Sequence, residues 1–171
     1  SAVIEGTSVL KNKSIISAQL DTEILMAKAL GKSREYIILN HDKVLNIENL
    51  EYFKKLVNER ANRKPIAYLL NKKFFWKSEF YVNKNTLIPR PDTEIIIEQI
   101  LKVTRNKNNL RILDIGVGSG CILLSILKER KNFYGSGIDI RKNSLEISKI
   151  NAKKLLLDQR VKFYESNVDK F

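Results

Sequence analysis

The stretch that decides the fold is Arg111-Ile112-Leu113-Asp114-Ile115-Gly116-Val117-Gly118-Ser119-Gly120-Cys121-Ile122. Its apolar start, residues 112–115, predicts a short buried strand, and the apolar spacing of residues 122–127 predicts a helix. Three glycines at alternate positions separate the two, where backbone conformations with positive φ are needed and a ligand can touch the main chain. Backbone N–H groups and the N-terminus of the helix then face that ligand.

The same pattern repeats after this stretch. Residues 133–138 predict a second strand that ends at Asp139, residues 145–157 a second helix, and residues 161–164 a third strand. Alternating strands and helices indicate a parallel sheet with right-handed crossovers. Asp139 lies 19 residues after Gly120, at a strand end where a carboxylate can accept hydrogen bonds from both ribose hydroxyls. The combination predicts a nucleoside-cofactor site rather than a tight turn with a solvated aspartate.

The glycine spacing disfavours a dinucleotide. A G-x-G-x-x-G fingerprint that starts at Gly116 requires its last glycine at position 121, and this chain has Cys121 there. Cys121 could be activated at a helix N-terminus, but its apolar surroundings favour a small core residue.

The first part of the chain has a different pattern. From Ser14 to Arg63 the apolar residues recur at helical spacing, with Gly31 as a stop and with Ser33 and Asn46 as N-caps. We therefore expect a small helical bundle in residues 1–70. Aromatic and β-branched runs at 72–76, 79–82 and 86–88, with a polar turn at 83–85, predict a β-hairpin linker in residues 71–91. Residues 92–171 form the remaining domain.

Composition excludes several classes of protein. The chain has 171 residues, a net charge of +12, one cysteine and one histidine. One cysteine forms no internal disulfide, His41 has no Cys or His partner for a metal site, and no apolar run is long enough for a membrane span. Each half of the chain carries +6, so the charge indicates a Lys/Ile/Asn-rich composition rather than a nucleic-acid-binding stripe, with a polyanionic partner as the alternative. We expect a cytoplasmic protein.

Three runs resemble one family. They are Leu20-Asp21-x-Glu23-Ile24-Leu25, Arg60-x-x-Arg63-Lys64-Pro65-Ile66-Ala67-Tyr68-Leu69 and Leu87-Ile88-Pro89-Arg90-Pro91-Asp92-Thr93-Glu94. Together with the glycine stretch, which resembles motif I of class I S-adenosylmethionine-dependent methyltransferases, they resemble the HemK/PrmC family. Its members are protein-(glutamine-N5) methyltransferases that modify peptide chain release factors.

The resemblance implies an α/β fold class: a small N-terminal helical bundle that docks the substrate, a β-hairpin linker, and the first half of a Rossmann-like class I methyltransferase domain. It implies S-adenosyl-L-methionine as the cofactor and peptide chain release factors as partners. In that resemblance the methionine end is held by Asp114, Gly116, Val117, Gly118, Ser119 and Gly120. Asp139 holds the ribose, Asn167 and Val168 flank the adenine, and Arg90 and Glu94 border the acceptor pocket.

The chain departs from the family in one respect. Family members hold the acceptor amide with an Asn-Pro-Pro-Tyr motif, whereas the only prolines here are Pro65, Pro89 and Pro91. A Rossmann-like methyltransferase sheet has seven strands, and residues 111–171 supply three. We therefore expect the amino-terminal part of a longer protein, with no catalytic residue in this part and no methyl transfer by it alone.

Two other functions remain open from the sequence. A DNA or RNA adenine-N6 methyltransferase uses the same Asn-Pro-Pro-Tyr chemistry on a planar amino nitrogen, and the helical bundle could act as a non-catalytic docking module for a release factor. A second, tRNA-modifying methyltransferase domain occurs in some members of the family. Trp76 could stack on bases, but packing in the hairpin between the two domains is favoured.

Overall fold

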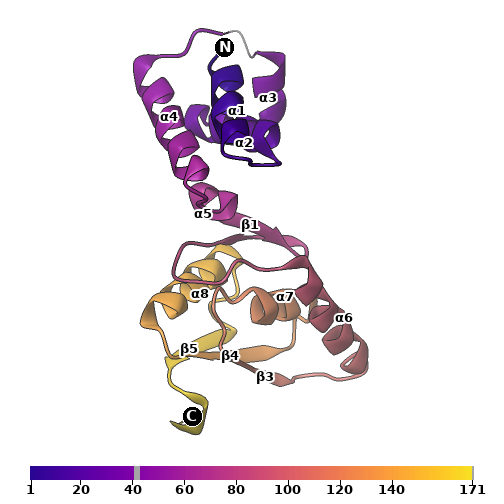
Figure 1. Cartoon of the computed structure of the whole chain (residues 1–171). Helices are drawn as coiled ribbons and strands as arrows, with labels where there is room; N and C mark the ends of the chain where they lie inside the picture. The colour runs from indigo at the N-terminus through magenta and orange to yellow at the C-terminus, as the bar shows by residue number, and fades with distance from the viewer. Residues whose placement is uncertain (41–42, 171) are drawn as a thin grey trace. The chain divides into compact units, whose positions relative to one another are not determined.

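The computed structural model describes residues 1–40 and 43–170, so His41 lies outside the described residues. The chain divides into two compact units, Ser1–Leu70 and Asn71–Phe171 (Figure 1). The first is entirely helical in its described part, and the second is α/β. We describe each unit by itself.

Unit 1 is a bundle of short helices: α1 (Ala2–Asn12), α2 (Ala18–Leu30), α3 (Arg34–Leu39), α4 (Ile47–Ala61) and α5 (Ile66–Leu70). The expected helix ends are confirmed. Gly31 is left-handed at the C-cap of α2, and the side chains of Ser33 and Asn46 accept N–H bonds from Tyr36 and Asn49. These bonds satisfy backbone donors that a helix start otherwise leaves unpaired.

Helix α1 precedes the helical pattern that the sequence revealed from Ser14 onward. Its Leu10 is fully buried, and a Cβ on Gly6 would lie 2.9 Å from the ring of Phe53. Glycine therefore permits the close approach of α1 and α4. Helix α1 does contain apolar residues, among them Val3 and Leu10, so the prediction of helical spacing only from Ser14 onward omitted it.

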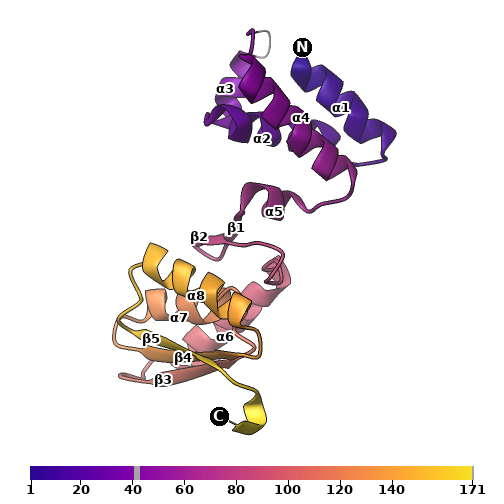
Figure 2. The same cartoon turned by 90° about the vertical axis from the view of Figure 1, so that its left-hand side faces the viewer.

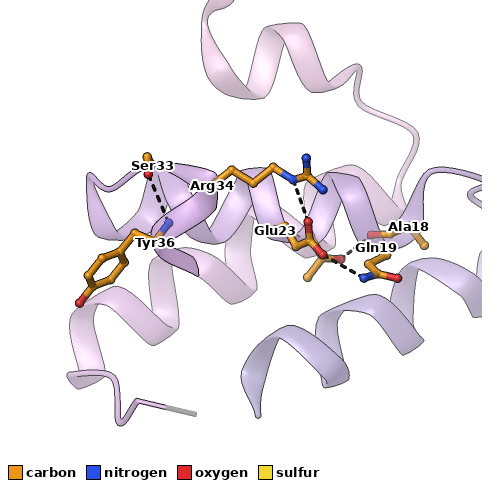
Figure 3. A network of polar contacts seen from close by, with 7 residues as sticks. Ala18, Gln19, Glu23, Ser33, Arg34 and Tyr36 are labelled. Atoms are coloured by element: carbon orange, nitrogen blue, oxygen red, sulfur yellow. Dashed lines mark hydrogen bonds and ion pairs between the residues drawn. The ribbon is translucent and has the colours of Figure 1, made fainter. Parts of the chain in front are cut away.

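Two carboxylates of the 20–25 run are buried and paired. Asp21 on α2 accepts from Arg60 Nε on α4 at 2.6 Å. Glu23 accepts from Arg34 Nε on α3 at 2.8 Å and from Gln19 at 3.0 Å (Figure 3). Because an unpaired buried charge is costly, these ion pairs fix how α3 and α4 pack on α2.

Unit 2 begins with a hairpin and continues as a three-stranded α/β layer. Its elements are β1 (Lys72–Phe75), β2 (Ser78–Tyr81), the 3₁₀ turn η1 (Pro91–Thr93), α6 (Glu94–Val103), β3 (Arg111–Ile115), α7 (Cys121–Glu129), β4 (Tyr134–Asp139), α8 (Lys142–Lys154), β5 (Val161–Glu165) and the 3₁₀ turn η2 (Val168–Lys170). Strands β3, β4 and β5 are parallel in that order, with Ile115 opposite Ile138 and Asp139 opposite Glu165. The expected fold class is confirmed.

Helices α6, α7 and α8 lie on the same face of this sheet (Figure 2). Leu123, Leu124 and Leu127 of α7 are fully buried there, in the core that also contains Phe75 and Phe80 of the hairpin. The opposite face is exposed, with Leu113, Ile115, Tyr134 and Tyr164 between 41% and 56% accessible. The core of unit 2 is therefore one-sided.

The hairpin differs from the expectation in two ways. Strands β1 and β2 meet in a two-residue turn at Trp76 and Lys77, and residues 86–88 are not a strand. The polar turn expected at 83–85 is present, because the Thr86 N–H donates to the Asn83 carbonyl at 3.1 Å and the Asn85 N–H donates to Asn83 Oδ1 at 2.9 Å. The hairpin also groups with unit 2 rather than forming a separate linker. Trp76 has a left-handed φ of 53°, and its N–H donates to Glu94 at 2.7 Å while its indole N–H donates to Glu129 at 2.8 Å. These bonds and the packing of Trp76 on the core of unit 2 hold the turn in place.

The end of α8 also differs. The apolar pattern predicted a helix through residue 157, but α8 ends at Lys154 and Leu156 is left-handed, with a φ of 58°. Arg160, just before β5, then donates to the carbonyls of Leu127, Arg130, Lys131 and Phe133. One guanidinium thus satisfies the C-terminal end of α7 and the loop that follows it.

Candidate functional site

Residues 116–120 form the turn between β3 and α7 that the glycine spacing predicted. Gly116, Gly118 and Gly120 all have left-handed φ values of 78°, 56° and 79°. A residue with a Cβ loses about 1–2 kcal/mol in this conformation. The carbonyl of Ile138 accepts the N–H groups of Gly116 at 2.9 Å and Val117 at 3.0 Å, so the start of the turn is fixed to β4. We call residues 116–120 the glycine loop.

The glycines serve two different spatial needs. A Cβ on Gly116 would meet no atom within 4 Å, so this side of the glycine loop is open. A Cβ on Gly120 would lie 3.0 Å from Leu124 and 3.5 Å from the Cβ of Ser148 on α8. The loop is therefore packed tightly against Leu124 of α7 at one end, with ordinary contact to α8, and it is bare at the other end, where a ligand can reach its backbone.

Asp139 lies beside this loop at the carboxyl end of β4. Only 6% of the residue is exposed, and its Oδ2 accepts the Gly118 N–H at 3.1 Å while Oδ1 accepts the Arg141 N–H at 2.9 Å. A carboxylate has about four acceptor positions, so about two remain for hydroxyl groups of a ligand. The structure thus brings Asp139 and the glycine loop together, as the spacing of the two in the sequence predicted.

Asp114 is the second carboxylate of the site, and its surroundings disfavour its charged form. Its pKa is raised to about 6, mainly by burial and to a smaller extent by the negative charge of Asp139, against the backbone N–H of Leu123 in the first turn of α7, which lowers it. The carboxylate is therefore held ionised at neutral pH in surroundings that disfavour its charge. A cationic ligand group nearby would relieve that penalty.

Two side chains on α8 also hold the glycine loop, and the sequence did not reveal them. Ser148 Oγ donates to the Gly118 carbonyl at 2.7 Å, and Asn151 Nδ2 donates to the Ser119 carbonyl at 2.8 Å. Both are completely buried. The sequence did offer one signal for them. Both polar residues lie on the same face of the helix as the apolar residues Leu145 and Ala152, which are buried.

The predicted adenine-flanking residues follow β5. The backbone N–H of Ser166 donates to the Asp139 carbonyl at 3.2 Å, so the segment that leads to Asn167 and Val168 starts beside Asp139. Both Asn167 and Val168 are exposed. Their contact with an adenine stays a prediction.

The predicted acceptor-pocket residues lie at the start of η1 and α6. Arg90 is exposed and precedes η1, and Glu94 starts α6 with its carboxylate bonded to the Trp76 N–H of the hairpin turn. The structure therefore gives Glu94 a role in holding the hairpin, which sequence reasoning did not include. The role of both residues in a pocket stays a prediction.

Other chemistry is limited in the described part of the chain. Burial raises the pKa of the Cys121 thiol to about 11, so it is not an activated nucleophile. Within residues 1–40 and 43–170, no group of three or more His, Cys, Asp or Glu side chains could hold a metal ion. None of the described helices has the length and apolar character needed to cross a membrane.

Family models match both units. Residues 1–70 match the PrmC N-terminal domain, and residues 106–171 match a methyltransferase domain. Along both units the chain resembles the HemK/PrmC family. The HemK/PrmC motifs quoted above therefore lie in both units, and the glycine loop lies within the methyltransferase domain.

The relatives that match this chain have two kinds of name. It is 42% identical over 163 residues to a release factor glutamine methyltransferase of Buchnera aphidicola, covering 95% of this chain and 58% of the relative. It is 38% identical over 161 residues to a release factor glutamine methyltransferase of Leptospira interrogans, covering 93% and 56%. It is 34% identical over 189 aligned positions to a bifunctional methyltransferase of Rickettsia bellii, covering 95% and 34%. The chain thus spans little more than half the length of the first two relatives.

Proposed function

We propose that this chain supplies the substrate-docking unit and the cofactor-binding half of a methyltransferase that modifies a glutamine side chain, at N5, in peptide chain release factors. The proposal rests mainly on the combination of domains, because one chain joins a match to the PrmC N-terminal domain with a match to a methyltransferase domain. The same chain aligns over 95% of its length with a release factor glutamine methyltransferase. The bundle, residues 1–70, is the docking unit, and residues 92–171 carry the cofactor site.

The residues present fit S-adenosyl-L-methionine. The glycine loop is bare at Gly116, where a side chain would otherwise occupy the open side. Asp139 has unused acceptor positions for two ribose hydroxyls, and Asn167 and Val168 follow the next strand end for the adenine. Asp114, ionised in a site that disfavours its charge, favours the cationic methionine end.

S-adenosyl-L-methionine supplies an activated methyl group on a sulfonium that carries its own leaving group. The chain's contribution is positioning: Asp139 would hold the ribose and the glycine loop the methionine end, which reduces the entropic cost of aligning the reactants. The glutamine amide is a weak nucleophile because its nitrogen lone pair is delocalised. In the family this is offset by the Asn-Pro-Pro-Tyr motif, which is not among the 171 residues. Residues 1–171 alone therefore bind cofactor weakly and do not transfer the methyl group.

The partners follow from this assignment. The protein acts on release factors in the cytoplasm, at translation termination, without insertion into a membrane. Because the positive charge is spread evenly, direct nucleic-acid binding is not required. The Rickettsia bellii relative is named a bifunctional methyltransferase, which is consistent with a second, tRNA-modifying domain in some proteins of this family.

The test measures ligand binding by each unit within the intact 171-residue chain. ¹⁵N-labelled residues 1–171 are titrated with S-adenosyl-L-homocysteine, which detects binding up to millimolar dissociation constants, and separately with a purified peptide chain release factor. The cofactor product should shift the amide signals of Gly116, Gly118 and Gly120, and the release factor should shift signals of residues 1–70. Asp139→Ala should abolish the first response and leave the second unchanged.

Asp158→Ala is the matched control, because it removes an exposed carboxylate from the segment between α8 and β5. It should leave both titrations unchanged. Signals that shift with S-adenosyl-L-homocysteine outside unit 2, or a release factor that binds no part of unit 1, would contradict the proposal. So would methylation of a release factor by residues 1–171 alone.

A further inference from the structure

Helix α8 presents a line of buried polar side chains to the rest of unit 2. Ser144, Ser148 and Asn151 occur at intervals of four and three residues, so they lie on one face of the helix, and each has 0% exposure. We call these three residues the polar line. Burying polar groups costs free energy unless each is hydrogen-bonded, so their partners show why they are there.

Asn151 joins the hairpin to the glycine loop. Its Oδ1 accepts the Tyr81 N–H at 2.7 Å, and its Nδ2 donates to the Tyr81 carbonyl at 3.0 Å and to the Ser119 carbonyl at 2.8 Å. Because Tyr81 offers one donor and one acceptor, the amide can face it in only one orientation. The side chain therefore uses its acceptor and both amide hydrogens, and it links β2 to the glycine loop through a single rigid group.

Ser148 acts on the neighbouring peptide unit. Its hydroxyl donates to the Gly118 carbonyl at 2.7 Å. In a trans peptide the carbonyl and the next N–H point in opposite directions, so the Ser119 N–H is directed away from α8. The Ser119 carbonyl is held by Asn151, and the following N–H, of Gly120, is bonded to the Val117 carbonyl at 2.8 Å.

The glycine loop cannot fix these peptide orientations by itself. Three of its five residues have no side chain, and glycine has the largest conformational freedom to lose on ordering. Ligand affinity falls when a site must be ordered at the moment of binding. Two buried donors on a rigid helix remove that cost in advance.

We propose that Asn151 and Ser148 are positioning residues that hold the glycine loop ready for the adenosyl cofactor, and that Asn151 makes the loop and the β1–β2 hairpin a single rigid assembly. This inference rests on the proposed function only for the identity of the ligand. Ser144, the third member of the polar line, donates instead to the carbonyl of Asn85, which lies outside the glycine loop, at 3.0 Å. It provides a matched control of the same burial on the same helix face.

The experiment compares Ser148→Ala, Asn151→Ala and Ser144→Ala in the intact 171-residue chain. All three are followed by NMR titration with S-adenosyl-L-homocysteine at a temperature where each is folded, and by amide hydrogen exchange without ligand. We expect Ser148→Ala and Asn151→Ala to weaken binding by about fivefold or more, the effect of losing one such hydrogen bond. Ser144→Ala should bind within about twofold of the unmodified chain, since it loses a similar bond away from the loop.

Hydrogen exchange separates this inference from the proposed function. In Asn151→Ala and Ser148→Ala the amide of Gly120, whose own acceptor is Val117, should exchange at least about tenfold faster than in Ser144→Ala, because a bond that opens locally exposes its N–H. The amide of Gly135 in β4, bonded to the Arg160 carbonyl, is the internal reference. If the unmodified chain binds no S-adenosyl-L-homocysteine, the cofactor assignment fails, and the exchange rates alone decide the inference. Equal exchange at Gly120 in all three variants, or equal loss of affinity in all three, would overturn it.

Discussion

Replacing Asp114 with asparagine should stabilise unit 2 at neutral pH while weakening cofactor binding. Burial raises the pKa of this carboxyl to about 6, against an ordinary value of 3.8. The folded state therefore holds the proton more tightly than the unfolded state does. The contribution of this carboxyl to the free energy of unfolding is greatest below pH 4 and falls as the pH rises to about 6. The shift corresponds to about 3 kcal/mol of lost stability above that pH.

Trp76 provides the assay. It is the only tryptophan of the chain and belongs to unit 2, so its fluorescence during urea unfolding reports the unit that contains Asp114. At pH 7.5, Asp114→Asn should raise the free energy of unfolding by about 1–3 kcal/mol, less than the full value because the new amide N–H groups need partners. At pH 4 the variant and the unmodified chain should differ little.

The matched control is Asp158→Asn, which neutralises an exposed carboxylate of the same unit. Its free energy of unfolding should follow the unmodified chain at every pH within about 0.5 kcal/mol, as surface substitutions usually do. If Asp114→Asn shows the same pH dependence as the unmodified chain, burial does not penalise this carboxylate and the reasoning is refuted. In the same variant, the affinity for S-adenosyl-L-homocysteine should fall, since the negative charge opposite the methionine end is lost.

Three further predictions concern packing and backbone conformation. Arg60→Met leaves Asp21 buried without its cation and should destabilise unit 1 by about 3–5 kcal/mol in thermal unfolding followed by far-UV circular dichroism, with partial recovery when Asp21→Asn is added. Gly137→Ala places a Cβ 2.8 Å from Val117, so it should lower the free energy of unfolding of unit 2 by about 1–3 kcal/mol in urea unfolding. An unchanged midpoint would contradict this, because it would mean that β4 and the glycine loop can move apart without cost. Gly116→Ala meets no atom but keeps a φ of 78°, so it should cost about 1–2 kcal/mol while abolishing the cofactor titration, and normal binding would contradict the assignment of the open side.

The sequence predicted the glycine loop and Asp139 because their physics is local. Left-handed glycines between a strand and a helix have few alternatives to a tight turn. The end of the next parallel strand must lie beside that turn, because consecutive parallel strands present their carboxyl ends at the same edge. The hydrogen bond from the Gly118 N–H to Asp139 confirms that reasoning.

The parts that the sequence did not predict depend on long-range contacts. The hairpin turn at Trp76 is stabilised by Glu94 and Glu129, which lie 18 and 53 residues away, and neither Trp76 nor Lys77 is a typical turn residue. In the same way, the role of Asn151 depends on Tyr81, 70 residues earlier. Polar residues on a helix indicate burial only when the packing partner of that face is known.

The connection between the two units is very short. Helix α5 ends at Leu70 and β1 begins at Lys72, so Asn71 alone separates them. Under the proposed function, a release factor bound to unit 1 would be tethered to unit 2 through this single residue, and a short tether gives an effective concentration on the order of millimolar. Under that proposal, the glutamine-bearing segment would need little affinity of its own for the cofactor-binding unit. Selectivity for the correct protein and recognition of the side chain can thus be divided between two weak interactions, which allows rapid release of the product.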